Sequence, residues 1–201
     1  MNRALKFGLP MVFIFAWLVA MLPCAFAKDR IFHGKVIDYE TREPIEGAVV
    51  VAYWDEGRAT LAGQSTRLKD VKETLTDKNG EWSISGPEGR LNDPNPIFSF
   101  LTGIHYTQEP QFIIFKPGYC SWPEGFAIDA CKDKIRQSGI GTWVEGGNIE
   151  LPKLTDREDR IKAQSISIPA GEGALQKLGE LIRLINEERR NLGLREDLKY
   201  K

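Results

Sequence analysis

The sequence predicts a mostly β protein, a small β-sandwich followed by helices, and three observations support this prediction. Residues 48–54 form a nearly continuous apolar run rich in valine, which is typical of a strand buried on both faces. Residues 81–85 alternate strictly between polar and apolar side chains, the period of a strand with one buried face. After residue 171, leucine and isoleucine recur at helical spacing instead. A chain of 201 residues can hold one such domain with appendages.

The N-terminal residues have the composition of an export signal. Arg3 and Lys6 give a basic start, residues 11–22 are an uninterrupted apolar run, and Ala25 and Ala27 supply the small-x-small pattern that signal peptidase accepts. This run is short for a membrane span, which needs about 20 residues. We therefore expect cleavage after Ala27, no stable transmembrane span in the mature chain, and a periplasmic or secreted protein.

Two alternatives to cleavage stay open. The segment 1–27 can remain as an uncleaved membrane anchor, or Cys24 can carry a lipid. The residue before a lipid-modified cysteine is normally small, and here it is Pro23.

The first strands are expected at residues 30–38 and 48–54, both rich in β-branched side chains. The polar segment between them ends near Pro44, whose fixed φ and missing N–H suit a turn. Residues 55–69 are polar and mixed in charge, so we expect a long loop there. A third strand is expected at residues 70–76.

The Asp-Lys-Asn-Gly sequence at residues 77–80 is a strong turn signal. The aspartate can accept hydrogen bonds from the backbone ahead of it, and the Asn-Gly pair tolerates positive φ. Together with the alternating residues 81–85, this turn predicts a β-hairpin that points Trp82 and Ile84 inward.

The second half of the sandwich carries more irregular segments. Residues 86–110 read as a loop whose apolar middle, 97–101, is expected to cover one edge of the sandwich. Further strands are expected at residues 111–115 and 147–151. Between them lies an insertion over residues 120–144.

The C-terminal part is expected to be helical. Thr155 and Glu158 form a capping box that predicts a short helix to about Ala163. A longer helix is expected over residues 171–193, where Gly193 is a natural left-handed stop. Its apolar stripe either packs on its own domain or docks to a partner protein. The stripe comprises Leu175, Leu178, Ile182 and Ile185, widened by Leu181 and Leu184.

Removal of the signal leaves Cys120 and Cys131 as the two cysteines of the chain. Two cysteines in an exported protein are most simply one structural disulfide, because oxidising compartments favour it. A reactive thiol pair or a metal site is the alternative, but the sequence has no Cys-x-x-Cys spacing and no histidine beside either cysteine.

Four blocks of the sequence carry a resemblance to a known family: residues 34–38, 43–50, 76–84 and 115–119. Over about residues 30–118, and to 151 with the last strand, the chain resembles the carboxypeptidase regulatory-like domain. The resemblance implies a seven-stranded Greek-key β-sandwich like that of transthyretin, in a family that is a reused scaffold without an activity of its own.

The resulting domain organisation has three parts. They are a signal peptide at residues 1–27, a β-sandwich domain at residues 28–152, and a helical C-terminal extension at residues 153–201.

Catalytic chemistry is not expected from the residues present. The chain has two histidines, His33 and His105, and no His-x-x-Glu spacing for a metallopeptidase or Gly-x-Ser-x-Gly motif for a serine hydrolase. His33 lies inside the first expected strand and is interpreted as structural. Ring-cleaving iron dioxygenases on related sandwich folds need two His and two Tyr ligands, and nothing in the sequence positions these two histidines together. We therefore expect no enzyme, no metal and no cofactor.

The expected function is a non-enzymatic exported module that acts in binding or in an envelope assembly, with the C-terminal helix as its contact to an envelope protein. The alternative is a domain that binds carbohydrate or peptide through the loop aromatics Tyr106, Trp122 and Trp143, whose large rigid rings suit stacking. A net charge of −1 argues against nucleic acid as a partner.

Overall fold

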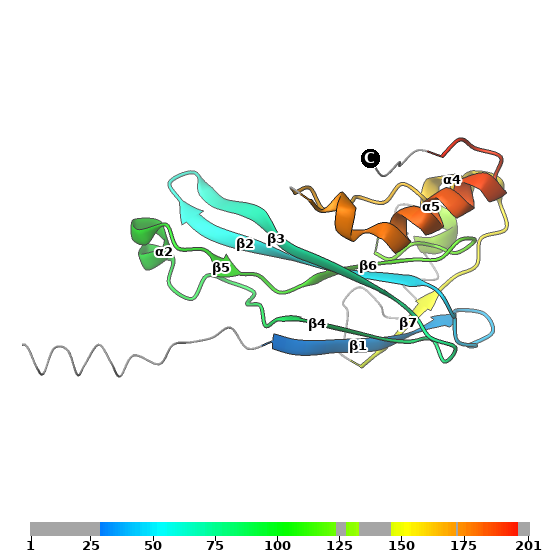
Figure 1. Cartoon of the computed structure of the whole chain (residues 1–201), viewed down its shortest axis with the longest axis horizontal. Coiled ribbons are helices and arrows are strands. Elements are labelled where there is room, and N and C mark those ends of the chain that lie inside the picture. The colour runs from blue at the N-terminus through cyan, green and yellow to red at the C-terminus, as the bar shows by residue number, and fades with distance from the viewer. Residues whose placement is uncertain (1–28, 124–127, 133–145, 172, 197–201) are drawn as a thin grey trace, which may run out of the picture.

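The computed structural model describes residues 29–123, 128–132, 146–171 and 173–196 of the chain. Strands in two sheets make up most of the regular structure, and helices pack outside them (Figure 1). The prediction of a mostly β fold with C-terminal helices is therefore confirmed. The expected signal peptide, Cys24 and Trp143 lie outside the described residues. Among the helices that are described, none has both the length and the apolar character needed to cross a membrane.

The first sheet is built around β1 (Asp29–Asp38). It pairs antiparallel with β4 (Glu81–Pro87) and parallel with β7 (Asn148–Leu151). In both β1 and β4, alternate residues are buried, as the polar and apolar alternation predicts.

The second sheet is built around β2 (Val49–Thr60). Its neighbours are β3 (Gly63–Leu75), β5 (Tyr106–Thr107) and β6 (Gln111–Phe115), all antiparallel to β2. The prediction of a loop at residues 55–69 is wrong, because these residues continue β2 and β3 as one long hairpin.

The polar composition of this hairpin end has a physical reason. The strands project beyond the core, so both faces can carry charges that pair across them. Arg67 lies 2.8 Å and Lys69 lies 3.2 Å from the carboxylate of Glu56.

The turn at residues 77–80 forms as predicted, but the hairpin does not. A side-chain oxygen of Asp77 accepts from the amides of Asn79 and Glu81 at 2.8 Å, and Gly80 has φ +73°. β3 pairs with β2, whereas β4 pairs with β1, so the turn carries the chain from one sheet to the other. The carbonyl of Gly80 accepts from the amide of Val36 at 2.8 Å, which directs the chain toward β1.

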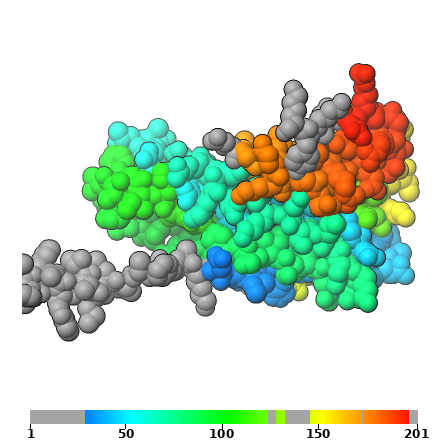
Figure 2. Space-filling view, in the orientation of Figure 1, coloured from blue at the N-terminus to red at the C-terminus, as the bar shows by residue number. Residues whose placement is uncertain are grey.

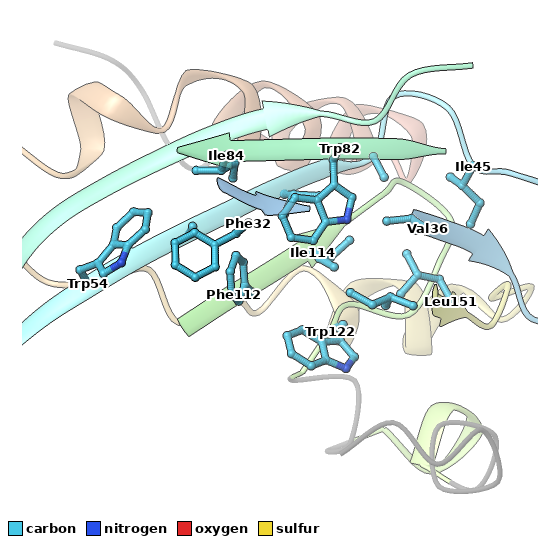
Figure 3. Close-up of a cluster of buried hydrophobic side chains, with 14 residues drawn as sticks. Phe32, Val36, Ile45, Trp54, Trp82, Ile84, Phe112, Ile114, Trp122 and Leu151 are labelled. Carbon is cyan, nitrogen blue, oxygen red and sulfur yellow. The ribbon is translucent and has the colours of Figure 1, made fainter. Parts of the chain in front are cut away.

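The first hydrophobic core lies between the two sheets (Figure 3). Trp82 and Ile84 point into it, as the alternation predicts. Its centre is aromatic: the ring of Phe32 lies 6.0 Å from that of Trp54 and 5.9 Å from that of Phe112. Tilted and edge-to-face aromatic pairs at such distances add to the free energy gained by burial.

A second core lies on the other face of β2, beneath α5 (Gly179–Asn191). Val49 and Val51 meet Leu178, Leu181 and other apolar residues of the C-terminal segment. Figure 2 shows the orange and red C-terminal residues lying over this side of the molecule. The apolar stripe therefore packs on its own domain, apart from Leu175, which is 48% exposed. A partner contact through the remaining surface of the helix stays a prediction.

The long helix expected over residues 171–193 is shorter than predicted, with a 3₁₀ turn η2 (Leu175–Lys177) ahead of α5. The start of α5 is fixed by a strand, because the carboxylate of Glu73 in β3 accepts from the amides of Glu180 at 2.7 Å and Leu181 at 3.0 Å. An acidic group at a helix N-terminus satisfies free amides and complements the helix dipole. Gly193, at φ +70°, takes the left-handed conformation expected after the helix.

The short helix α4 (Arg157–Ala163) contacts α5 through a buried ion pair. Its N-cap is Asp156 and not Thr155, because the aspartate accepts from two amides of the first turn. Arg160 donates from two nitrogens to the buried carboxylate of Glu188 in α5, each at 2.7 Å. Glu188 also accepts from the amide of Gly118 at 3.2 Å.

A small third core contains the disulfide between Cys120 and Cys131, whose Cα atoms are 6.0 Å apart. This pairing agrees with the sequence prediction. Ile128, Leu154 and Ala163 pack around it, so the disulfide lies beneath α4.

The segment at residues 86–110 contains a helix, α2 (Pro96–Thr102), where a loop was predicted. Asn95 caps it by accepting from the amide of Phe98 at 3.1 Å, and Gly103 ends it at φ +73°. The apolar side chains at 97–101 do not cover a sandwich edge as predicted, because they face solvent.

Tyr119 and Asp38 link the end of β6 to the turn after β1. The Tyr119 hydroxyl donates to Asp38 Oδ2 at 3.1 Å, while Asp38 Oδ1 accepts from the amides of Glu40 at 2.8 Å and Thr41 at 2.9 Å. Burial raises the pKa of Asp38, but these hydrogen bonds outweigh it and the pKa is lowered overall.

Replacement of Glu188 by alanine should lower the free energy of unfolding by about 3 kcal/mol, because Arg160 and the Gly118 amide lose a buried acceptor. Urea unfolding followed by tryptophan fluorescence measures this loss. The matched control Glu187→Ala removes an exposed carboxylate one residue earlier and should cost less than about 1 kcal/mol. Equal losses in the two variants would contradict the role assigned to Glu188.

The pKa of Tyr119 is raised to about 12, first by burial and then by the Asp38 carboxylate. A tyrosine in an unfolded chain titrates near 10. The stability that Tyr119 contributes is therefore fully present below about pH 10 and is lost as the pH rises through about 12. Absorbance titration of the phenolate should show that Tyr119 loses its proton at about pH 12. The substitution Asp38→Asn should move this deprotonation toward lower pH. Tyr39→Phe should leave the late transition in place.

Candidate functional site

A pocket of about 570 Å³ opens on the first sheet. We call it the His33 pocket. β1, β4 and β7 line it together with the end of β3 and the turn at residues 77–80. Its polar lining consists of His33, Lys35, Thr74, Asp77, Glu81, Ser83 and Asn148.

Strand register places these side chains beside one another. His33 lies opposite Ser83, and Lys35 lies opposite both Glu81 on β4 and Asn148 on β7. Directly opposed residues of neighbouring strands have Cβ atoms about 5 Å apart. An imidazole, a hydroxyl, an amide, an amine and a carboxylate therefore share one face of a sheet.

Gly34 forms part of the floor of the pocket, because the indole ring of Trp82 comes close to its backbone. A Cβ atom at this position would stand 3.0 Å from Cζ2 of Trp82 and 3.2 Å from the carbonyl oxygen of Gly147. A side chain at Gly34 would press on both groups, and each would have to move by a few tenths of an ångström to admit it.

The His33 ring is held at one edge of the pocket. Its Nε2 atom lies about 3.4 Å from where a Cβ of Gly146 would be, and the amide of Gly146 donates to the His33 carbonyl at 3.0 Å. Gly146 has φ +74°, which favours glycine. The backbone at residue 146 therefore packs against the ring while the side chain of His33 stays exposed.

The polar groups of the pocket differ in whether they already have a role in the fold. The carboxylate of Asp77 holds the turn, and Lys35 stands across from the oppositely charged Glu81. His33, Ser83 and Asn148 are exposed polar side chains that can donate and accept hydrogen bonds. The site suits a small molecule with hydroxyl, carboxyl or amide groups.

His33 lies inside a strand, as the sequence analysis expects, and its side chain is exposed in the lining of the pocket. The signal that could have identified it is the strand period, because the inward-facing Phe32 requires its neighbour His33 to point outward. The other members of the pocket come from strands far apart in sequence, and only their register brings them to His33.

Tyr106 and Trp122, two of the three aromatics expected to form a stacking platform, do not lie together. Trp122 is 6% exposed and belongs to the core between the sheets (Figure 3), so its ring offers no open face. It bridges to Ile114, which pairs with Val50 of β2, whereas Tyr106 pairs with Gly57 of β2. Seven residues of strand separate these two points, a distance of about 20 Å. Trp143 lies outside the described residues.

The described residues do not fit an iron site of two histidines and two tyrosines. His33 lies on β1 of the first sheet, whereas His105 precedes β5 of the second. Over the ranges that the structure describes, no three His, Cys, Asp or Glu side chains gather closely enough to hold a metal ion.

Comparison with protein-family models finds no match, and no curated protein matches the sequence. Several solved structures match in part. The catechol 1,2-dioxygenase of Acinetobacter radioresistens is 19% identical with a TM-score of 0.34, covering 72% of this chain and 57% of the enzyme. The 3-chlorocatechol 1,2-dioxygenase of Rhodococcus opacus 1CP is 25% identical with a TM-score of 0.27, covering 48% of this chain and 42% of the enzyme.

The catechol 1,2-dioxygenase of Acinetobacter sp. ADP1 is 13% identical with a TM-score of 0.35, covering 73% of this chain and 59% of the enzyme. The chain thus spans between 42% and 59% of the length of these proteins. The matched structures are enzymes and not carboxypeptidase regulatory-like domains, so the expectation of a non-enzymatic binding or assembly module is contradicted and is withdrawn. TM-scores below 0.5 carry no argument for a dioxygenase activity of this chain.

Proposed function

We propose that this protein binds a small polar molecule in the His33 pocket and that His33 exchanges a proton with it. The observation that supports this proposal most directly is the alignment of His33, Ser83 and Asn148 on adjacent strands around a pocket of about 570 Å³. That volume lies within the usual range for small-ligand sites.

The strands supply the precision that such a site needs. Three hydrogen-bonded strands carry the polar side chains, and the inward neighbours of these side chains belong to the aromatic core. A site on a packed sheet holds its groups more precisely than a site on loops. Hydroxyl and carboxyl groups of a ligand can pair with the Ser83 hydroxyl and the Asn148 amide.

His33 is suited to the proton exchange because an imidazole ring carries one nitrogen that can donate a proton and one that can accept it. The charged groups that line the same pocket are Lys35, Asp77 and Glu81. Lys35 and Glu81 oppose one another across the strands.

Nuclear magnetic resonance of the two histidine rings tests the proposal directly. The full chain, labelled at histidine, is titrated with a panel of small hydroxy acids, diols and amides. Binding should shift the His33 signals saturably while those of His105, which lies outside the pocket lining, stay in place. Ser83→Ala and Asn148→Ala should each weaken binding by up to about tenfold, the value of one hydrogen bond.

Ser85→Ala is the matched control, since Ser85 is an exposed serine two residues along β4 and outside the pocket lining. Its affinity should equal that of the wild type. The proposal fails when no compound of the panel moves the His33 signals, or when Ser83→Ala binds as tightly as Ser85→Ala. Analysis of the recovered compound by mass spectrometry shows whether binding is followed by chemical change.

We also infer that the chain is exported and that its sandwich is a Greek-key, transthyretin-like domain. The export inference rests on the basic start, the apolar run at residues 11–22 and the small residues before Lys28. The connection from β3 to β4 between the two sheets favours the Greek-key arrangement. Mass spectrometry of the protein from its own cells should find Lys28 at the N-terminus, whereas a mass that includes residues 1–27 would contradict cleavage.

A further inference from the structure

Two opposite charges in the His33 pocket face each other without forming an ion pair. Strand register sets Lys35 of β1 directly opposite Glu81 of β4. Within the described residues, neither side chain has a partner of opposite charge. The other sheet offers a comparison, because Arg67 and Glu56 are opposed in the same way across β3 and β2 and lie 2.8 Å apart. Lys35 and Glu81 therefore each keep a charge that a ligand can pair with.

The acidic groups of the pocket lie at its β4 edge. Glu81 begins β4, and Asp77 lies in the turn just before it. Thr74, near the end of β3, adds a hydroxyl to the same lining. One oxygen of Asp77 already accepts from two backbone amides of the turn, so Glu81 is the main free acceptor. Carboxylate oxygens form strong hydrogen bonds with an ammonium group.

The groups that donate hydrogen bonds lie on the other side of Glu81. The sheet order is β4, β1, β7, so Lys35 stands between Glu81 and Asn148. These three residues form a row of carboxylate, ammonium and amide that spans two strand spacings, about 10 Å. The ammonium and the amide can both donate to a carboxylate. A ligand that lies along this row therefore meets an acceptor at one end and two donors at the other.

We propose that the ligand of the His33 pocket is a zwitterion, a small molecule that carries both an ammonium and a carboxylate group, as a free α-amino acid does. Its ammonium group pairs with Glu81, and its carboxylate group pairs with Lys35 and Asn148. This inference rests on the proposed function, since it names the class of molecule that the pocket binds.

Ligands with a single charge fit this lining less well. A simple carboxylate pairs with Lys35 but brings a like charge toward Asp77 and Glu81. A simple amine pairs with Glu81 and leaves Lys35 without a partner. Hydrogen bonds to charged groups are about twice as strong as those between neutral groups, so an uncharged ligand forgoes the stronger contacts at both ends. A zwitterion gains both of them.

Titration of the histidine-labelled full chain with matched compounds tests this inference. L-leucine supplies both charges, its 2-hydroxy acid replaces the ammonium by a hydroxyl, and its amide replaces the carboxylate by an uncharged group. The same sets of three are built on alanine and on phenylalanine to vary the size of the side chain. In at least one set, the amino acid should bind at least about tenfold more tightly than either counterpart, the value of one charge-assisted hydrogen bond. The His33 ring signals report the binding.

Two substitutions separate the two ends of the ligand. Glu81→Gln should weaken binding of the amino acid by about tenfold or more and should not weaken binding of the hydroxy acid, which has no ammonium group. Lys35→Gln should weaken binding of both and leave the affinity for the amide unchanged. The matched controls are Glu88→Gln and Lys78→Gln, which change the net charge equally from exposed positions outside the pocket lining. Both controls should bind every compound as the wild type does.

The outcomes distinguish this inference from the proposed function. If a hydroxy acid, a diol or an amide moves the His33 signals at least as readily as every amino acid does, the zwitterion is wrong while the binding site stands. Equal losses of the amino acid and the hydroxy acid in Glu81→Gln would also overturn the inference, because Glu81 would then not recognise the ammonium group. His33 signals that respond to no compound at all would contradict both the inference and the proposed function.

Discussion

The burial of β2 on both faces is the constraint on which the rest of the structure depends. Val49, Val50, Val51 and Ala52 are completely buried. Val50 and Ala52 face the aromatic core between the sheets, whereas Val49 and Val51 face α5. Burial of each valine side chain contributes about 1.5–3 kcal/mol. The strand needs a cover on each side, and this requirement gives the C-terminal segment its place.

The parts of the fold that the sequence predicts well are those with local causes. The run at residues 48–54 predicts a doubly buried strand, and the Asp-Lys-Asn-Gly turn forms through its own side-chain hydrogen bonds. The errors arise where distant partners decide. The polar strands beyond residue 55 are stabilised by pairing with each other. Charged residues such as Glu56 and Arg67 give no sequence signal of this pairing. The start of α5 likewise depends on Glu73, a residue more than one hundred positions earlier.

The candidate site was less predictable than the fold, because no local motif encodes it. His33 and Ser83 are fifty residues apart, and only the register between β1 and β4 makes them neighbours. The alternation in β1 could have shown that His33 faces outward, but not what stands beside it. Conversely, Trp122 has the sequence context of a loop aromatic, yet its bridge to Ile114 draws it into the core. Composition reveals which groups a chain contains, whereas register decides which groups meet.

The covering of β2 by the last helix also sets an order of events during synthesis. Val49, Val51, Val71, Ile113 and Phe115 form an apolar face that closes only when residues 178–185 arrive. Because the ribosome adds residues from the N-terminus, this face stays open until residues 178–185 have been made. An apolar sheet face that is open during synthesis is prone to aggregation. The docking of α5 is therefore the step that removes this apolar surface from water.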